Sequence, residues 1–448
     1  MNLQRPGITP AVSASLAGLL FGFDTAVISG VTEALRSQFA LSPTGLGLAV
    51  SAALWGTLLG ATCSGRPGDR YGSRTLLLWI AAAYIVSAIG SAAAHDLWTF
   101  LLFRFVGGLA IGGSSVLAPV YISEVSPSHR RGFMVGLFQF NIVAGILIAY
   151  FSNFMIASAF AEGDAWRWKL AVAAAPSALF LLMLLRIRDS PRWLASKGLT
   201  ERARAAANRL GMADGNWETV ALQDGSARLN WHAHARPILL ALAIAAFNQL
   251  SGINAILYYI NDIFAAAGFD RVSADVQAVG IGVANLIATL FAMTIIDRVG
   301  RRPLLLVGAT GTTLALAGVA AIYGFGAGAQ WLLPLLILFI VSFAISQGAV
   351  IWVYLSEIFP TAVRARGQAL GSATHWVLNA VLSLTFPMIA AHSQALPFLF
   401  FAGAMAVQFF VVWRWFPETR GVSLEDMESI MTGTGARPRP GHSVQTHF

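Results

Sequence analysis

Long apolar stretches separated by short polar segments run through the chain from its first residues to Phe416. A membrane-spanning helix needs roughly 20 mostly apolar residues, and the pattern contains twelve stretches of that kind. It therefore predicts an all-α membrane protein with twelve transmembrane helices. The expected spans are 10–30, 45–64, 74–94, 97–120, 132–153, 167–187, 237–266, 274–296, 303–323, 331–355, 366–390 and 396–416.

The composition supports a membrane protein, since 56% of the 448 residues are hydrophobic and only 11% are charged. The charged share is about half that of an ordinary soluble domain. The first apolar run lacks the charged start and small-residue cleavage site of a signal peptide, so we expect it to be retained as the first helix. The single cysteine, Cys63, excludes disulfides within the chain and cysteine-cluster metal sites. We expect it to be a small packing residue.

The net charge of +8 would suit a nucleic-acid partner if the basic residues formed one patch. They gather instead in alternate loops, as in membrane proteins whose basic loops stay inside the cell. The basic segments hold Arg66, Arg70, Arg74, Arg130, Arg131, Arg298, Arg301, Arg302, Arg364, Arg366 and a cluster from Arg186 to Arg236. The opposite loops hold Arg36, Arg167, Lys169 and Arg271. We therefore expect both termini in the cytoplasm, membrane lipid around the chain and no nucleic-acid partner.

Three motifs at the ends of even-numbered helices occur twice, at similar spacings. Asp-Arg-Tyr-Gly-Ser-Arg at 69–74 returns as Asp-Arg-Val-Gly-Arg-Arg at 297–302, Ser-Glu-Val at 123–125 returns as Ser-Glu-Ile at 356–358, and Asp189 is matched by Glu418. Internal duplication is typical of secondary transporters. It predicts two pseudo-symmetric six-helix bundles, residues 1–187 and 237–416. A cytoplasmic linker with amphipathic helices, 188–236, would join them, and 417–448 would form a tail with a short helix and a disordered end.

With these motifs the chain resembles the sugar porter family of the major facilitator superfamily over essentially its whole length. The resemblance rests on Asp-Arg-x-Gly-x-Arg after helices 2 and 8, Ser-Pro-Arg-Trp-Leu after helix 6, Asn-Gln-Leu-Ser-Gly-Ile-Asn in helix 7, Ser-Glu-Ile-Phe-Pro after helix 10 and Pro-Glu-Thr-Arg-Gly after helix 12. It implies a carrier of the inner membrane that imports a monosaccharide with protons, without a cofactor, as its two halves rock about a central site. We expect a monomer. Four positions depart from the family's usual pattern: Ser73 replaces an arginine, Asn248 a glutamine, Ala349 a proline and His375 an amide.

Asp24 lies in the middle of the first helix, where an ionisable side chain is costly unless it has a partner. Arg104 is the one basic residue expected well within a span of the first half. At about 1.5 Å per residue, Asp24 lies ~21 Å from the inner end of helix 1 and Arg104 ~10 Å from the outer end of helix 4, nearly the same depth in a core of about 30 Å.

We therefore expect Arg104 to neutralise the Asp24 carboxylate, and protonation of Asp24 from outside to release Arg104. The alternative is a permanent ion pair that only holds the two helices together. By the resemblance, an acid at this place is typical of symporters.

Side-chain amides are concentrated in the spans, and they suit a neutral sugar because each offers both donors and an acceptor. Helix counting puts several of them near the midplane, where such carriers bind substrate. By the resemblance, the sugar-binding positions fall on Gln139, Gln249, Asn254, Asn285, Trp352 and Asn379, with Phe21, Asn248, Tyr258, Gly348, His375 and Trp376 nearby. Any one amide could instead only bond a neighbouring helix, and Trp352 could be an interface aromatic. His375 could be a ligand contact, a pH-sensitive group or a packing residue.

The spacing within helix 7 resists a simple helix. Gln249 and Asn254 are five residues apart, which on an ideal helix turns them ~140° away from each other. Gly252 between them could break the helix so that both face the cavity. The part beyond the break, through Tyr258 and Tyr259, would then be a moving gate.

Charged residues at the inner helix ends repeat in the two halves and form a candidate conformational latch. By the resemblance, they bond across the inner ends of the helices when the carrier opens outward and separate when it opens inward. The set is Asp69, Arg70, Arg74, Glu124, Arg131 and Asp189, with Asp297, Arg298, Arg302, Glu357, Arg366 and Glu418.

Other classes of function lack their motifs in this sequence. No lysine belongs to a phosphate-binding Gly-Lys-Ser/Thr loop, no metal-protease or nucleophile-elbow motif indicates an intramembrane enzyme, and the tail is short for a sugar receptor. The glycines of Gly107-Gly108 and Gly112-Gly113 are expected to allow close helix packing. Facilitated uniport of a sugar or polyol is the alternative to symport, and no motif chooses among hexoses, pentoses and polyols.

Overall fold

The computed structural model describes residues 8–126, 131–160, 163–210, 229–360, 363–422 and the single positions 427, 430 and 431. This part of the chain is predominantly helical and contains twelve spans long and apolar enough to cross a membrane. The predicted all-α fold with twelve spans is therefore confirmed. The spans are Ile8–Gly30, Pro43–Cys63, Ser73–Ala93, Leu97–Val125, Phe133–Ala159, Ala165–Arg186, Ala235–Tyr258, Ser273–Val299, Arg301–Phe325, Ala329–Glu357, Arg366–His392 and Leu396–Trp415.

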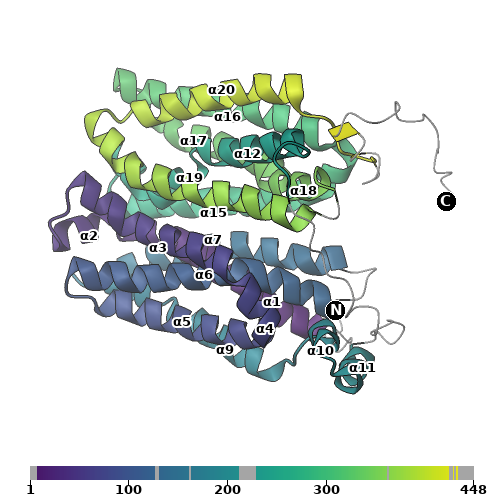
Figure 1. Ribbon diagram of the computed structural model, residues 1–448. Helices are drawn as coiled ribbons and strands as arrows, with labels where there is room; N and C mark the ends of the chain where they lie inside the picture. The colour runs from purple at the N-terminus through teal and green to yellow at the C-terminus, as the bar shows by residue number, and fades with distance from the viewer. Residues whose placement is uncertain are drawn as a thin grey trace.

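The first and the last six spans form two bundles that pack against each other (Figure 1). The N-terminal bundle contains α1 (Ile8–Val27), η1 (Ile28–Gly30), α2 (Thr32–Gln38), α3 (Pro43–Cys63), α4 (Gly65–Tyr71), α5 (Ser73–Ala93), α6 (Leu97–Val125), α7 (Arg131–Ala159), α8 (Ala165–Ala171) and α9 (Ala174–Arg186). The C-terminal bundle contains α12 (Ala235–Leu250), α13 (Ile253–Tyr258), α14 (Ile260–Ala266), α15 (Arg271–Val299), α16 (Arg301–Phe325), η4 (Ala329–Trp331), α17 (Leu332–Phe343), η5 (Ala344–Gly348), α18 (Ala349–Glu357), α19 (Arg364–His392) and α20 (Leu396–Trp415).

Short helices mark the two ends of the molecule. The helix α2 lies at one end, and the linker helices α10 (Pro191–Ser196) and α11 (Thr200–Arg209) lie at the other, on the side where α1 begins and α20 ends (Figure 1). We call these the α2 end and the α10 end. The amphipathic helix expected in the linker is present as α11. Residues 211–228 of the linker, most of 423–431 and the tail beyond 431 lie outside the described residues.

Local signals in the sequence explain where several helices begin and end. Ser42 precedes Pro43 and accepts a hydrogen bond from the Gly45 amide at the start of α3, which satisfies an amide that has no partner within the helix. The repeated Asp-Arg-x-Gly motif ends a helix in each bundle, because Gly72 (φ +89°) and Gly300 (φ +103°) adopt backbone angles that other residues rarely adopt. The next helix starts at the following residue in both cases.

Glycines hold the helices of the N-terminal bundle close together. Gly108 and Gly112 of α6 pack directly on the backbone of α3, and Gly22 of α1 packs on the backbone of α7, so that none of the three sites has room for a Cβ atom. The packing role expected for the glycines of α6 is confirmed at Gly108 and Gly112. These contacts fix α1, α3, α6 and α7 relative to one another and so position the polar side chains that they carry.

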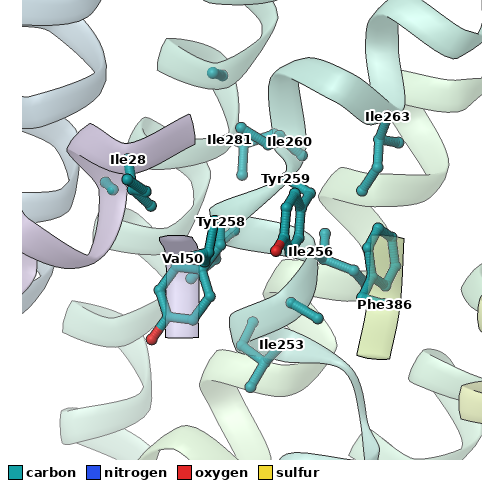
Figure 2. Packing of buried hydrophobic residues seen from close by; sticks show 14 of the residues in the cluster. Ile28, Val50, Ile253, Ile256, Tyr258, Tyr259, Ile260, Ile263, Ile281 and Phe386 are labelled. Atoms are coloured by element: carbon teal, nitrogen blue, oxygen red, sulfur yellow. The ribbon is translucent and has the colours of Figure 1, made fainter. Parts of the chain in front are cut away.

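An apolar cluster joins the two bundles toward the α2 end. Ile28 and Val50 of the N-terminal bundle belong to it, together with Tyr258, Ile281 and Phe386 of the C-terminal bundle (Figure 2). None of these five side chains is more than 5% exposed. Because the buried apolar surface is contributed by both bundles, the hydrophobic effect holds them together here.

Polar contacts between the bundles occur at the same end. They are the ion pairs Arg36–Asp262 (3.2 Å) and Lys169–Asp275 (3.4 Å) and the hydrogen bond from the Tyr150 hydroxyl to the Leu257 carbonyl (3.0 Å). At the α10 end, the hydrogen bonds and ion pairs among described residues stay within one bundle. The molecule is therefore closed at the α2 end, whereas no bond between the bundles is found among the described residues at the α10 end.

Three features differ from the sequence expectations. Lys169, counted with the charges of the outer loops although it falls within the expected span 167–187, is part of α8 and has a fully buried side chain. Cys63, expected to pack in the interior, is exposed. The tenth span is not a plain α-helix, because the π-helical segment η5 (Ala344–Gly348) interrupts it. An apolar composition predicts a span but does not show such a local change in helix type.

Candidate functional site

The pair expected inside the membrane is present. Arg104 of α6 donates two hydrogen bonds to the Asp24 carboxylate of α1, from Nη1 to Oδ1 at 2.5 Å and from Nη2 to Oδ2 at 2.9 Å. The Arg104 side chain is 4% exposed and that of Asp24 16%. The predicted contact is confirmed, and its two parallel bonds are the strong arrangement for a guanidinium and a carboxylate.

Two small voids flank this ion pair. One of about 10 Å³ is lined by Asp24 and Arg104 together with Tyr258 and Trp376. The other, of about 20 Å³, is lined by the same pair together with Tyr84. Each has room for about one water molecule, so water can lie against the carboxylate on either side.

The predicted break in helix 7 is confirmed. The helix α12 ends at Leu250, Gly252 adopts φ +79° in the left-handed region, and α13 starts at the next residue. The break brings Gln249 and Asn254 together, since the Asn254 amide donates to the Gln249 side-chain oxygen at 3.1 Å. A second interruption at Tyr259 separates α13 from α14.

Gln249 is the centre of a polar cluster in the C-terminal bundle. Its side-chain nitrogen donates to Asn248 Oδ1 at 3.1 Å and lies 3.1 Å from the Nδ1 atom of His375. The His375 ring in turn packs against Trp352 and Trp376, with ring centroids 5.3 and 5.0 Å away. His375 and Gln249 are buried, whereas Trp352 is 42% exposed. The cluster thus combines amides with aromatic faces, as a sugar-binding site requires.

A second polar group lies where α13 meets α19. The Asn379 amide donates to the Tyr258 hydroxyl at 3.2 Å, and Ser383 donates to the Asn379 oxygen at 3.3 Å. Tyr258 also lines the void beside Asp24. The tyrosine predicted to be part of a gate therefore touches both a predicted sugar-binding residue and the cavity of the ion pair.

Gln139 and Asn285 lie on the facing helices α7 and α15. Gln139 lies about one turn from Gly136, which approaches Met293 of α15, and Asn285 lies about one turn from Gly282, which packs on Leu147 of α7. Neither amide has a hydrogen-bond partner among the described residues, whereas the amides of α12 and α13 bond one another and Asn379 of α19 bonds Tyr258. Their donors and acceptors are available to a ligand.

An aromatic contact joins the bundles next to the ion pair. Phe21 of α1 lies three residues before Asp24, and its ring centroid is 5.6 Å from that of Trp376 in α19. Gly348 is the last residue of η5, directly after Gln347, whose carbonyl accepts from Asn248, and one turn before Trp352. The structure thus brings together all the predicted sugar-site residues except the separate pair Gln139 and Asn285.

The buried amides Gln347 and Gln408 were not among the predicted site residues. Gln347 donates to the Gln408 side-chain oxygen at 2.8 Å, and its backbone carbonyl accepts from Asn248 at 3.5 Å. Both side chains are essentially inaccessible to solvent. A polar residue in the middle of an apolar span was the available signal.

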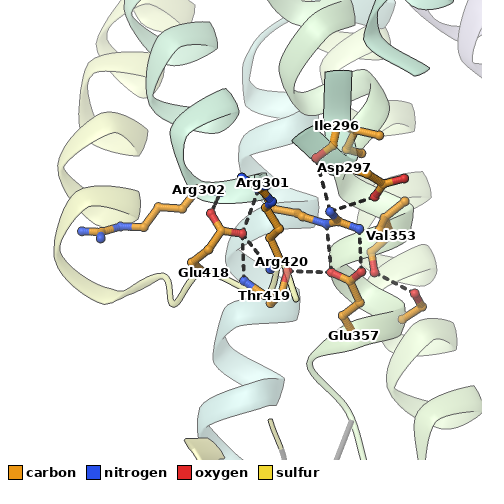
Figure 3. Close-up of polar contacts among 10 residues, drawn as sticks. Ile296, Asp297, Arg301, Arg302, Val353, Glu357, Glu418, Thr419 and Arg420 are labelled. Atoms are coloured by element: carbon orange, nitrogen blue, oxygen red, sulfur yellow. Dashed lines mark hydrogen bonds and ion pairs between the residues drawn. The ribbon is translucent and has the colours of Figure 1, made fainter. Parts of the chain in front are cut away.

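The charged cluster of the C-terminal bundle is centred on Arg301, another residue that was missed. Its guanidinium donates to both Glu357 oxygens at 2.8 and 3.1 Å and pairs with Asp297 at 3.0 Å (Figure 3). Glu418 accepts from the backbone amides of Arg301 and Arg302, and Thr419 donates to Glu357 (Figure 3). The prediction had chosen Arg302, whose guanidinium bonds the Trp413 carbonyl instead.

The corresponding cluster of the N-terminal bundle lacks such an arginine. Ser73 occupies the position that matches Arg301, and Glu124 accepts a hydrogen bond from the Ser190 hydroxyl at 2.5 Å. The backbone carbonyl of Asp69 accepts from the Trp193 ring. The other predicted latch residues Arg70, Arg74, Arg298 and Arg366 form no ion pair with another described residue, and the side chain of Arg131 lies outside the described part.

Comparisons with known proteins agree with this geometry. A model of the family described as sugar (and other) transporters matches residues 11–431. The D-xylose-proton symporter of Escherichia coli (strain K12) is 33% identical over 93% of this chain and 94% of that protein. The glucose transporter GlcP of Staphylococcus epidermidis is 36% identical over 95% of this chain and 98% of that protein. The solved inward open conformation of the xylose transporter XylE from E. coli matches with a TM-score of 0.84 and 30% identity over 94% of this chain and 98% of that chain.

Proposed function

Because the chain belongs to the sugar transporter family of the major facilitator superfamily, we propose that it imports a hexose or a pentose across the inner membrane in symport with protons. As a member of that family it is a multi-pass membrane transporter and not an enzyme. The similarity to a D-xylose-proton symporter and to a glucose transporter supports a monosaccharide as the substrate.

The observation that carries the proton coupling is the buried Asp24–Arg104 pair. Ionised Asp24 is held by the guanidinium, and a proton on the carboxylate would remove the charge that holds Arg104 in place. Water in the adjoining voids would deliver the proton. When the Asp24 carboxylate gains a proton, it no longer balances the charge of Arg104, whose side chain is 4% exposed. The interaction free energy between α1 and α6 therefore changes.

Two contacts connect this acid to the sugar site. Phe21 is one turn before Asp24 on α1 and packs on Trp376. Tyr258 lines the void beside the acid and accepts a hydrogen bond from Asn379. A shift of α1 or α13 on protonation would therefore move the groups that hold the sugar. Sugar binding would in turn alter the affinity of Asp24 for its proton.

The sugar would lie between the bundles, held by neutral amides and covered by aromatic rings. Gln139 and Asn285 offer hydrogen-bonding groups that have no protein partner among the described residues. Gln249 and Asn254 would exchange their mutual hydrogen bond, and Asn379 its bond to Tyr258, for bonds to sugar hydroxyls. Trp352, whose side chain is 42% exposed, and Trp376 would supply apolar faces for the ring.

We further propose that the α2 end faces the outside and the α10 end the cytoplasm, so that the structure is the inward-facing state. The concentration of arginines at the α10 end supports this orientation, and both termini would then be cytoplasmic. Among the described residues, the bonds of Glu124 and Glu357 at that end stay within their own bundles, as the latch proposal expects for the inward-facing state. We propose a monomer as the working unit, since each chain holds a complete site.

The experiment that tests the function is uptake into proteoliposomes. A panel of labelled hexoses, pentoses and polyols is offered with and without an inward proton gradient, while the pH of the external medium is recorded. Symport predicts accumulation above the external concentration only with the gradient, and alkalinisation of the medium when the sugar is added.

Facilitated uniport is the alternative outcome of the same experiment. It predicts that uptake stops at equal concentrations on both sides and that the external pH does not change. Failure of every sugar and polyol in the panel to enter the vesicles would contradict sugar transport itself. The control is size-exclusion chromatography of protein extracted from the vesicles, which shows that it is folded.

A further inference from the structure

The most deeply buried ion pair of the described chain lies away from the site above. Lys169 of α8 and Asp275 of α15 are 3.4 Å apart, and their side chains are 0% and 1% exposed. The helix α8 belongs to the N-terminal bundle and α15 to the C-terminal bundle. The two charges therefore face each other across the boundary between the bundles.

Further hydrogen bonds hold both charges in place. The Lys169 ammonium donates to the Gly30 carbonyl at 3.0 Å, and Asn261 donates to the other Asp275 oxygen at 2.5 Å. Gly30 ends η1 in the N-terminal bundle, and Asn261 is the second residue of α14 in the C-terminal bundle. Each charge is thus also bonded by its own bundle, so the ion pair can separate without leaving either charge unsupported.

The pair lies just behind a large cavity at the α2 end. This cavity of about 680 Å³ is lined by Gly30, Asn261 and Ala274, and also by Arg36 and Asp262, whose ion pair is partly exposed. Gly30 and Asn261 are the hydrogen-bond partners of the buried pair. One layer of residues therefore separates Lys169 and Asp275 from external water.

We propose that Lys169 and Asp275 form a lock that keeps the carrier closed at the α2 end and must separate and hydrate in every transport cycle. The inference rests on the proposed alternating movement of the two bundles. If the bundles rock apart at the α2 end, α8 moves away from α15 and the cavity deepens to reach both charges. Water then replaces the partner that each charge loses.

The burial of the pair sets the sign of its effect on the two states. Removing one charge leaves the other buried and unpaired in the inward-facing state, which is strongly unfavourable, whereas in the outward-facing state the remaining charge is hydrated. Each single neutralisation therefore shifts the equilibrium outward. Neutralising both removes this penalty but also the attraction between the two charges, so closure is recovered only in part. The Arg36–Asp262 pair, with side chains 50% and 21% exposed, is partly screened by water and therefore holds the bundles together less strongly.

The test measures exposure of a cysteine beneath the apolar cluster. Cys63 is replaced by serine, so that Val50→Cys is the single thiol of the chain. Val50 is 2% exposed in this state and belongs to the cluster that joins the bundles. The full-length protein in oriented proteoliposomes is treated with a membrane-impermeant maleimide from the outside, and the labelling rate is measured. Neither a sugar nor a proton gradient is needed, so the lock can fail while the symport proposal stands, and the reverse.

The lock predicts a specific pattern among four variants. Lys169→Met and Asp275→Asn are each expected to raise the labelling rate about tenfold or more. The double variant is expected to return to within about threefold of the parent, and the matched control Arg36→Gln/Asp262→Asn to change it by about threefold or less. Parent-like labelling of the single variants, or single effects that simply add in the double variant, would overturn the proposal.

A variant with a buried unpaired charge can also fail to fold. Asn261→Leu tests the lock without creating a buried unpaired charge, because it only removes a hydrogen bond to Asp275. It is expected to raise the labelling rate about threefold, and labelling at the parent rate would contradict the lock.

Discussion

Replacing Asp24 by asparagine removes the charge on which the proposed coupling depends and keeps the size of the side chain. The amide offers one oxygen where the carboxylate offered two, so one of the two Arg104 donors faces an NH₂ group instead of an acceptor. Arg104 is 4% exposed and loses its compensating charge. We expect a destabilised but folded carrier that still binds sugar and no longer responds to protons.

The expected result depends on two free energies, the cost of leaving Arg104 unpaired and the free energy that the proton gradient supplies. An unpaired buried charge costs about 3–5 kcal/mol, and the two water-sized voids beside the pair place the expected loss toward the lower figure. A proton gradient of one pH unit supplies about 1.4 kcal/mol per proton, which supports up to about tenfold accumulation of a sugar carried with one proton. Asp24→Asn is expected to reduce this accumulation to about equal concentrations.

The assay compares two transport modes in the same vesicles. Accumulation is measured with an imposed proton gradient, and exchange of internal for external labelled sugar is measured without one. We expect Asp24→Asn to lose accumulation and retain exchange. The double variant Asp24→Asn/Arg104→Gln has no unpaired charge and should recover thermal stability but not accumulation. Undiminished accumulation by Asp24→Asn would refute the assignment of Asp24 as the proton site.

Three further changes test the site geometry. Gly252→Ala places a side chain at φ +79°, which costs about 1–2 kcal/mol, and it is expected to slow exchange at least about fivefold; an unchanged exchange rate would show that the helix break has no role in transport. Tyr258→Phe removes the acceptor for Asn379 and is expected to raise the KM for sugar about fivefold, or ~1 kcal/mol, in initial-rate uptake; a KM equal to that of the parent would contradict this contact. Arg301→Ser removes both bonds to Glu357 and is expected to destabilise the purified protein by about 1–3 kcal/mol in thermal unfolding. Arg301→Lys is its matched control and should not restore stability, because an ammonium cannot reproduce the paired bonds of a guanidinium.

The twelve spans and the Asp24–Arg104 contact could be predicted because each follows from a strong local constraint. A buried charge in lipid needs a partner, and depth along the helices left Arg104 as the match for Asp24. The break at Gly252 was predictable for a similar reason, since Gln249 and Asn254 could not otherwise face one cavity. In each case one physical requirement left only a few residues in the sequence that could meet it.

The features that escaped prediction depend on the packing of distant segments. Lys169 lies at the beginning of an apolar run, where a charge ordinarily marks a loop, and its burial depends on Asp275 more than one hundred residues later. Arg301 was passed over because its counterpart Ser73 is not an arginine, so the repeat pointed to the shared Arg302. The state that the structure adopts is not a property of the sequence pattern, because the same residues serve both states.

Because Ser73 matches Arg301, the charged clusters of the two bundles differ in the number of bonds that must change when the α10 end closes. In the C-terminal bundle Glu357 is satisfied by Arg301 and Thr419, so closing the α10 end must rearrange or supplement bonds that already exist. In the N-terminal bundle Glu124 has a hydroxyl partner in place of an arginine, so fewer charge-assisted bonds need to be rearranged there. The free-energy cost of leaving the proposed inward-facing state therefore falls mainly on the C-terminal cluster at the α10 end. At the α2 end, in our proposal, it falls on Lys169 and Asp275. Because both act across a two-state movement, weakening either should change the resting population of states without altering a contact to the sugar.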